Sequence, residues 1–333
     1  MVSMGKRARR AVMGVLVLGL LASCGGGTEQ ITPFEPTRYI AFGDEMSVLT
    51  KEAPVGRKYT VNAVGSDGVS PDCAANTSTQ PSLLWTQVLG NTFGFVFAEC
   101  NPANLGVTAF SYAAPGAKAD DFAAQVAEAR VVHGAFGCND LMSVLIGAND
   151  VIDLYETVYV ANPTSSTATA VTNELSARGA RLGQAIAALT ANNGPNVIVS
   201  TIPLMSVTPY ALRQAIARPG INAVNVLNQF SNAFNTALRT HIPNDGTRWG
   251  LVELDALLNA AVNNPNSYGL VNITQAVCTA DLPDCENVAA DLKPNGNAYT
   301  WLWASDRWIA WQAHARLGNF ARSRARDNPF GCG

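Results

Sequence analysis

The stretch that decides the fold reads RYIAFGDEMS at residues 38–47, where a short apolar run ends in a glycine and polar residues follow. Similar runs of β-branched or apolar residues lie at 107–112, 141–146, 197–202 and 250–254. Helical patterns separate them, for example at 117–129 and 173–191. Strands that alternate with helices predict an α/β fold: a three-layer α/β/α sandwich with a central parallel sheet, and a ligand site at the carboxyl ends of the strands.

The composition excludes several classes of protein. With 333 residues, 48% of them hydrophobic and 14% charged, the chain is too long and too apolar for a disordered segment or a small disulfide scaffold. Its 28 glycines and 17 prolines argue against a coiled coil or a collagen. The longest apolar run, residues 11–22, is shorter than the roughly 20 residues of a membrane span. We therefore expect one globular domain.

The first residues have the order of an export signal. Basic residues at positions 6–10 precede the apolar run, and LASC at 21–24 ends it. This ending resembles the signals of bacterial lipoproteins, which implies cleavage before Cys24, acylation of that residue and lipid anchoring in the cell envelope. Gly25, where an aspartate would mark retention in the inner membrane, implies the outer membrane. The alternative is an ordinary cleaved signal in which Cys24 has no role.

The charge balance argues against nucleic acid as a partner. Removal of residues 1–23 takes away four of the 22 basic residues and none of the 25 acidic ones, so the mature chain carries a formal charge of −7. Such a chain does not favour phosphate-rich polymers. The partner that the sequence does indicate is the membrane, reached through the lipid on Cys24.

Six cysteines remain besides Cys24, and an even number in an exported protein predicts disulfides. Six cysteines allow 15 pairings. The pairs that we expect are Cys278 with Cys285, Cys73 with Cys100 and, left over, Cys138 with Cys332. No Cys-x-x-Cys pair exists and the histidines stand far from the cysteines in the sequence, so we expect neither a metal nor a cofactor.

The chain divides into a signal at 1–23, a tether at 24–37, a domain at 38–325 and a tail at 326–333. Because the tether has no periodicity, we expect residues before Arg38 to contribute nothing to the core. Residues 51–81 are rich in Gly, Ser, Asn and Thr. They predict a long loop, which is either an excursion beside the site or merely decorative.

Landmarks follow three of the predicted strands in order. GDEMS at 43–47 comes after the first, SYAAPGA at 111–117 after the second and IGAND at 146–150 after the third. Together with NIT at 272–274 and a late helix that contains Ala313-His314, they resemble the SGNH or GDSL family of esterases and lipases. The resemblance covers about residues 38–320. It implies the flavodoxin-like fold of SGNH hydrolases and the hydrolysis of esters.

In that family a serine after the first strand attacks the ester, and its N–H, a glycine N–H and an asparagine side chain hold the oxyanion. The resemblance places Gly116 and Asn149 at the latter two donor positions. Glu45 occupies the position of the nucleophile, because the family's Gly-Asp-Ser-Leu reads Gly-Asp-Glu-Met here. Ser47 corresponds to a second, structural serine and is expected to point away from Glu45.

The family's other two triad residues form Asp-x-x-His just before the last helix. We expect that helix at 307–321. Alignment on the Ala-His pair places Ser305 where the aspartate belongs and Trp308 where the histidine belongs. His314, well around the predicted helix from Trp308, is interpreted as structural. The other two histidines, His133 and His241, are interpreted as surface residues in loops.

All three triad positions are thus altered while two oxyanion donors remain, which favours a noncatalytic binding or structural protein, a pseudoenzyme. An active ester hydrolase with Glu45 as an unconventional nucleophile or base is the alternative. A third interpretation pairs Ser47 with His314 after a local shift. An acyl or sugar ligand would suit a groove lined by tryptophans, although those near the last helix are better interpreted as core: Trp301, Trp303, Trp308 and Trp311.

Glu45 is expected to do more than remove the nucleophile. It begins a helix after the first strand, where unpaired N–H groups favour an anion. We therefore predict that its carboxylate fills the vacant oxyanion hole and accepts hydrogen bonds from the Gly116 N–H and the Asn149 amide.

Overall fold

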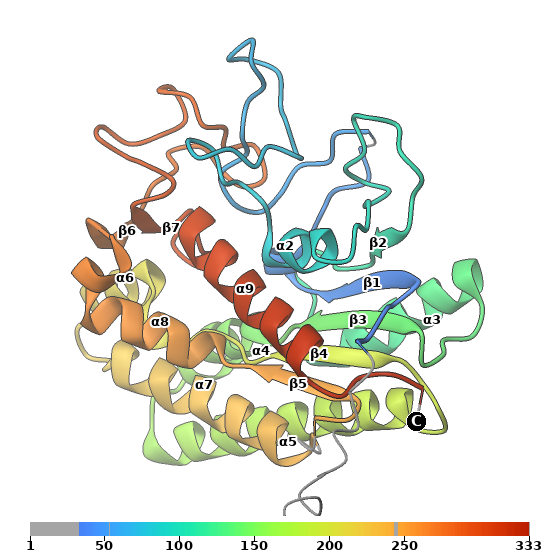
Figure 1. Ribbon diagram of the computed structural model, residues 1–333. Helices are drawn as coiled ribbons and strands as arrows, with labels where there is room; N and C mark the ends of the chain where they lie inside the picture. The colour runs from blue at the N-terminus through green and yellow to red at the C-terminus, as the bar shows by residue number, and fades with distance from the viewer. Residues whose placement is uncertain (1–32, 53, 243–245, 333) are drawn as a thin grey trace, which may run out of the picture. The chain divides into compact units, whose positions relative to one another are not determined.

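The computed structural model describes residues 33–52, 54–242 and 246–332 (Figure 1). The signal at 1–23, Cys24 and most of the tether lie outside these residues. A five-stranded sheet has the order β2-β1-β3-β4-β5, and every neighbouring pair is parallel. Its strands are β1 Arg38–Gly43, β2 Ala109–Ser111, β3 Asp140–Leu145, β4 Asn196–Ser200 and β5 Trp249–Val252. This order is that of a flavodoxin-like, doubly wound fold, which confirms the predicted fold class.

Helices cover both faces of the sheet, as Figure 1 shows with α2 and α9 on one face and α5 and α7 on the other. The α-helices are α2 Trp85–Asn91, α3 Phe122–His133, α4 Ala148–Leu154, α5 Ser165–Thr190, α6 Pro209–Ala217, α7 Ala223–Thr240, α8 Leu254–Asn263 and α9 Trp311–Asp327. The short helical turns are η1 Glu45–Ser47, η2 Ala119–Asp121, the π-helical η3 Tyr155–Tyr159, η4 Met205–Val207 and η5 Pro265–Tyr268. Gly318 lets α9 approach α2, because a Cβ there would lie 2.5 Å from Cβ of Val88.

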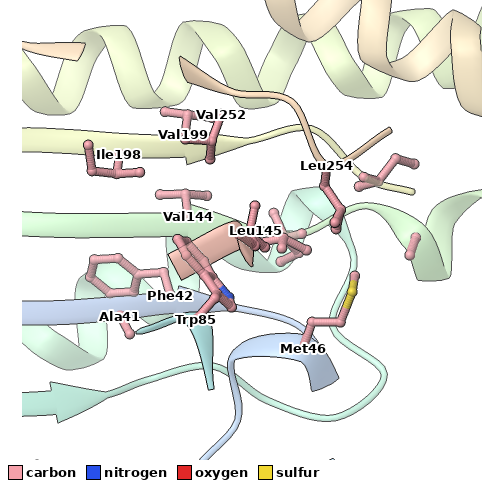
Figure 2. Close-up of a cluster of buried hydrophobic side chains, with 14 of the residues drawn as sticks. Ala41, Phe42, Met46, Trp85, Val144, Leu145, Ile198, Val199, Val252 and Leu254 are labelled. Carbon is pink, nitrogen blue, oxygen red and sulfur yellow. The ribbon is translucent and has the colours of Figure 1, made fainter. Parts of the chain in front are cut away.

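The core follows from the apolar runs of the strands. All residues of β3 and β4 are buried, as expected where helices cover both faces of a parallel sheet. Figure 2 shows part of this core, with Trp85 of α2 beside side chains of the strands. Its labelled side chains are Ala41, Phe42, Met46, Trp85, Val144, Leu145, Ile198, Val199, Val252 and Leu254.

A second, smaller cluster of buried residues shows that the 51–81 loop is not merely decorative. Val61 from this loop packs with Val277 and Trp301, and the Trp311 indole N–H donates to the carbonyl of Val61 at 2.6 Å. Thr60 Oγ1 donates to the carbonyl of Ile309 at 3.0 Å. A two-stranded parallel sheet of β6 Asn272–Ala276 and β7 Trp301–Trp303 lies beside this cluster.

The three expected disulfides are all present in the structure. Cys73 pairs with Cys100, Cys278 with Cys285 and Cys138 with Cys332. The Cys73–Cys100 disulfide links the 51–81 loop to the segment before β2. The Cys138–Cys332 disulfide links the C-terminal residues to the start of β3. The predicted pairing is therefore confirmed.

Two predicted boundaries are wrong. Phe34, expected in a tether without core contacts, is buried edge-on against Phe330, with 5.6 Å between the ring centroids. The last helix begins at Trp311 and not at residue 307, because residues 303–309 turn back on themselves: the N–H groups of Ala304 and Ser305 donate to the carbonyl of Trp308. Trp308 therefore precedes the helix.

No helix among the described residues is long and apolar enough to cross a membrane. Within the same part of the chain, no group of three His, Cys, Asp or Glu side chains is arranged to hold a metal ion.

Candidate functional site

The candidate site lies where β1, β2 and β3 end. Glu45 begins η1 directly after β1, Gly116 lies in the loop after β2, and Asn149 is in the first turn of α4 after β3. Because the three strands are adjacent and parallel, their carboxyl ends meet at one edge of the sheet. The three landmarks of the sequence are therefore brought together in space.

The Glu45 carboxylate is held by the two groups that were predicted to hold it. The Gly116 N–H donates to Oε1 at 2.9 Å, and the Asn149 side-chain amide donates to Oε2 at 2.8 Å. The Asn149 amide also donates to the carbonyl of Ala117 at 3.1 Å, which fixes its orientation. The predicted contacts of Glu45 are thus confirmed.

Gly43 allows the chain to turn from β1 into η1. Its φ is +151°, and a Cβ there would lie 2.2 Å from the carbonyl oxygen of Leu145 in β3. The Gln125 side chain from α3 bonds both backbone groups of Gly43, accepting from its N–H at 3.0 Å and donating to its carbonyl at 2.9 Å. The backbone that carries Glu45 is therefore fixed by β3 on one side and by α3 on the other.

Asp44, next to Glu45, is completely buried. One carboxyl oxygen accepts a hydrogen bond from the Met46 N–H at 3.2 Å, and the other has no hydrogen-bond partner among the described residues. Burial, and then the negative charge of Glu45, raise the pKa of Asp44 well above its usual range. The surroundings of Asp44 therefore disfavour its ionised form.

A family model matches a large part of this chain. Residues 59–292, well over half of the sequence, match the family described as GDSL-like Lipase/Acylhydrolase. The chain belongs to this family. The matched residues include Gly116 and Asn149, but they begin after Glu45 and end before Ser305.

Solved structures of GDSL-type and related esterases are similar to this family member. The lipase Lip_vut3 from a goat rumen metagenome shares 10% identity over 86% of this chain and 96% of its own, with a TM-score of 0.47. Axe2, an acetylxylan esterase from Geobacillus stearothermophilus, shares 14% identity over 88% of this chain and 96% of its own, with a TM-score of 0.43. A lipolytic G-D-S-L family protein from Veillonella parvula DSM 2008 shares 9% identity over 86% of this chain and 95% of its own, with a TM-score of 0.36. No curated protein matches the chain significantly.

Asp150 supports the site of this GDSL-family protein, although the sequence alone did not single it out for this role. It is buried in α4, where it accepts a hydrogen bond from the Ala119 N–H at 2.8 Å and one from Arg178 of α5 at 2.9 Å. Burial raises its pKa, against the opposing effect of the Arg178 guanidinium. The first bond ties the segment that follows Gly116 to the helix that carries Asn149, and the second ties that helix to α5. No short sequence motif predicts Arg178 as a partner of Asp150, because the two residues are 28 positions apart in the chain.

Tyr59 belongs to the 51–81 loop and is affected by the charge of Glu45. Its side chain is half-buried, and burial, and next the negative charge of Glu45, raise the pKa of its phenol. The packing of this loop against Trp301 and Trp311 argues against a merely decorative loop.

Ser47 is used structurally in this family member. Its Oγ accepts a hydrogen bond from the Trp85 indole N–H at 3.1 Å, and its carbonyl accepts one from the Ser111 hydroxyl at 3.2 Å. Both groups are buried. The serine thus faces α2 and β2, while Glu45 faces Gly116 and Asn149.

Ser305 and Trp308 lie in the turn before α9. Ser305 Oγ accepts hydrogen bonds from the N–H groups of Arg307 at 3.2 Å and Trp308 at 3.1 Å. The Trp308 side chain is buried, as are those of Trp301, Trp303 and Trp311. The tryptophans therefore belong to the core and do not line an open groove.

The three histidines do not pair with serines. Both ring nitrogens of His314 are buried without a hydrogen-bond partner, and burial, with a smaller effect of the positive charge of Lys58, lowers its pKa to about 3. His241 is exposed and bonds the carbonyl of Ala237. The interpretation of His133 as a loop residue is wrong: it ends α3, packs on Phe110 and bonds the Tyr112 hydroxyl at 2.9 Å. Among the described residues, no histidine accepts a proton from a serine.

Proposed function

We propose that this GDSL-family protein is a noncatalytic binding or structural protein of the bacterial cell envelope. The observation that carries the proposal is the Glu45 carboxylate, which accepts hydrogen bonds from both Gly116 and Asn149. In an esterase of the family, such donors must be free to receive the oxygen on which charge develops. Here an anion of the chain itself already satisfies them.

The supporting chemistry concerns the missing nucleophile. A serine hydroxyl needs a base within hydrogen-bond reach before it attacks an ester. Ser47 accepts its hydrogen bond from Trp85, and the ring nitrogens of His314 have no partner within the described residues. An ester carbonyl would therefore meet neither an activated hydroxyl nor a free pair of donors at this edge of the sheet. Any ligand of the acyl or sugar type would be bound without being hydrolysed.

Ester turnover decides between this proposal and an unconventional hydrolase. The mature protein is incubated with short p-nitrophenyl esters and, separately, with a fluorophosphonate probe; Glu45→Gln is the matched variant. We expect no turnover above the buffer rate and no labelled serine in either protein. Labelling of Ser47, or turnover that Glu45→Gln abolishes, would replace the proposal with an active site that uses Ser47 or Glu45.

We further propose that a lipid on Cys24 anchors the protein in the outer membrane. The supporting feature is the LASC sequence at 21–24 after a basic and then apolar stretch, with Gly25 next. Fractionation of cells that express the full chain tests it. We expect the protein in the outer membrane and Cys24→Ser in the soluble fraction, whereas a soluble wild-type protein would exclude the anchor.

A further inference from the structure

The described chain begins at the edge of the sheet opposite to the candidate site. Phe34 is buried against Phe330 and Phe93, and the Thr37 N–H donates to the carbonyl of Asn139 at 2.9 Å just before β1 begins. Figure 1 shows the start of β1, the end of α3 and the C-terminus on the same side of the domain. Phe34 therefore fixes the place on the domain at which the described chain begins.

The two edges of the sheet are well separated. β1 runs for six residues from Arg38 to Gly43 before Glu45 is reached. At about 3.3 Å per residue, the strand alone separates the two edges by about 20 Å. A surface that contacts the first edge is therefore not one that contacts the Glu45 site.

Exposed apolar side chains lie in the two segments that are bonded to the start of β1. Val131 and Val132, at the end of α3, are 87% and 65% exposed, and Leu105 and Val107 are exposed in the segment that leads into β2. Both segments are bonded to the start of β1: Arg38 donates to the carbonyl of His133 at 2.9 Å, and the Tyr39 N–H donates to the carbonyl of Thr108 at 3.0 Å. We call Leu105, Val107, Val131 and Val132 the amino-edge face.

Charge on this side of the domain is mixed. Arg130 and Arg326 are exposed and have no carboxylate partner among the described residues, and Glu35 and Asp327 are exposed nearby in the chain. The arginines suit anionic lipid headgroups, and the two carboxylates oppose them. These two arginines and two carboxylates have no net charge, so the apolar side chains favour a membrane more than the charges do.

The length of the preceding chain limits how far a lipid on Cys24 can be from this face. Nine peptide bonds separate Cys24 from Pro33, and the first residues after Cys24 are glycines. Such a chain spans at most about 30 Å when extended, and on average about 17 Å when flexible. We propose that the amino-edge face rests on the lipid bilayer and that the Glu45 site faces away from it. This inference rests on the proposed anchor at Cys24.

Accessibility to a lipid-borne quencher tests the orientation. Since the other six cysteines form disulfides and Cys24 would be acylated, an introduced cysteine would be the only free thiol. The full-length lipidated protein, carrying Val131→Cys or Val69→Cys labelled with bimane, is reconstituted into vesicles of phosphatidylethanolamine and phosphatidylglycerol with nitroxide on the headgroup. Val69 lies in the 51–81 loop and is 72% exposed, so it is the matched control. We expect several-fold stronger quenching at Val131 than at Val69.

The outcomes separate the orientation from the anchor. If the protein floats with the vesicles and the two labels are quenched equally, or Val69 more, the orientation is overturned and the anchor stands. If the protein does not float with the vesicles, the anchor fails and the orientation fails with it. A Val131 label that becomes protected in lipid-free Cys24→Ser protein as its concentration rises would assign this face to a second copy of the chain, which also overturns the proposal.

Discussion

The side-chain nitrogen of Asn149 lies 2.8 Å from Oε2 of Glu45, so a donor at a family oxyanion position is bonded to a carboxylate of its own chain. The partners come from the ends of β3 and β1, which are adjacent in the sheet. This hydrogen bond therefore joins two loops of the site, and it uses a donor that would otherwise be free to bind an oxyanion. Its contribution can be measured as a change in the free energy of unfolding, which requires no enzymatic reaction.

We expect Glu45→Gln to destabilise the protein by about 1 to 3 kcal/mol at neutral pH, because charge-assisted hydrogen bonds from Gly116 and Asn149 are replaced by neutral ones. Urea unfolding measures the change. The control is Glu128→Gln, since Glu128 is exposed and its pair with Lys51 lies in solvent. Equal effects of the two substitutions would show that the Glu45 contacts add no stability.

The sequence predicted the strands and the Glu45 site because both depend on local patterns. Buried parallel strands appear as apolar runs, and the residues that follow them are brought together by the sheet itself. The start of the last helix was wrong for a tertiary reason. Residues 303–309 have no helix-breaking residue, yet Ala304 and Ser305 bond the carbonyl of Trp308 and hold the segment in a turn.

Long-range partners could not be predicted in the same way. The bond from Arg178 to Asp150 and the burial of Phe34 against Phe330 join residues far apart in the chain, and no spacing rule relates them. The complete burial of His314 without a partner is likewise a property of packing between α9 and its neighbours. Sequence patterns indicated that His314 was structural but not that it would be uncharged.

His314 should make the protein sensitive to acid. Its pKa is about 3 in the folded state, against an ordinary value of 6.5, because of burial and then the charge of Lys58. Between these two pH values the unfolded chain binds a proton that the folded chain does not, so stability falls as pH falls through this window. The full loss is on the order of 5 kcal/mol, of which roughly 3 kcal/mol falls between pH 7 and 4. We expect His314→Leu to remove most of it, as followed by urea midpoints from pH 7 to 4.

The control for that experiment is His241→Leu, because His241 is exposed at the end of α7. It should leave the dependence on pH unchanged. If His314→Leu kept the acid sensitivity of the wild type, the buried imidazole would not be its source. Asp44 and Asp150 would not be its source either, because carboxyl groups whose pKa is raised by burial stabilise the folded state as pH falls.

Phe34→Ala should destabilise the domain by about 3 kcal/mol, because it removes a buried ring that packs on Phe330 and Phe93. Glu35→Ala, at the exposed neighbouring position, should change stability by less than about 0.5 kcal/mol. Thermal unfolding compares the two. If the Phe34 variant were as stable as the wild type, the contacts of Phe34 would add no stability, and residues before Arg38 would act only as a tether.

Restoration of the family residues should recover some ester hydrolysis only if all three positions are changed. Glu45→Ser alone frees the Gly116 and Asn149 donors but has no base, since His314 is buried without a partner. Addition of Ser305→Asp and Trp308→His supplies the Asp-x-x-His arrangement in a turn where Ser305 Oγ already accepts from the Trp308 N–H. The loss of the buried Trp308 ring costs about 3 kcal/mol, so assays with p-nitrophenyl acetate belong well below the melting temperature. Activity of the triple variant that Asn149→Ala removes would identify the two donors as a working oxyanion hole, whereas hydrolysis by Glu45→Ser alone would show that a histidine reaches the site after all.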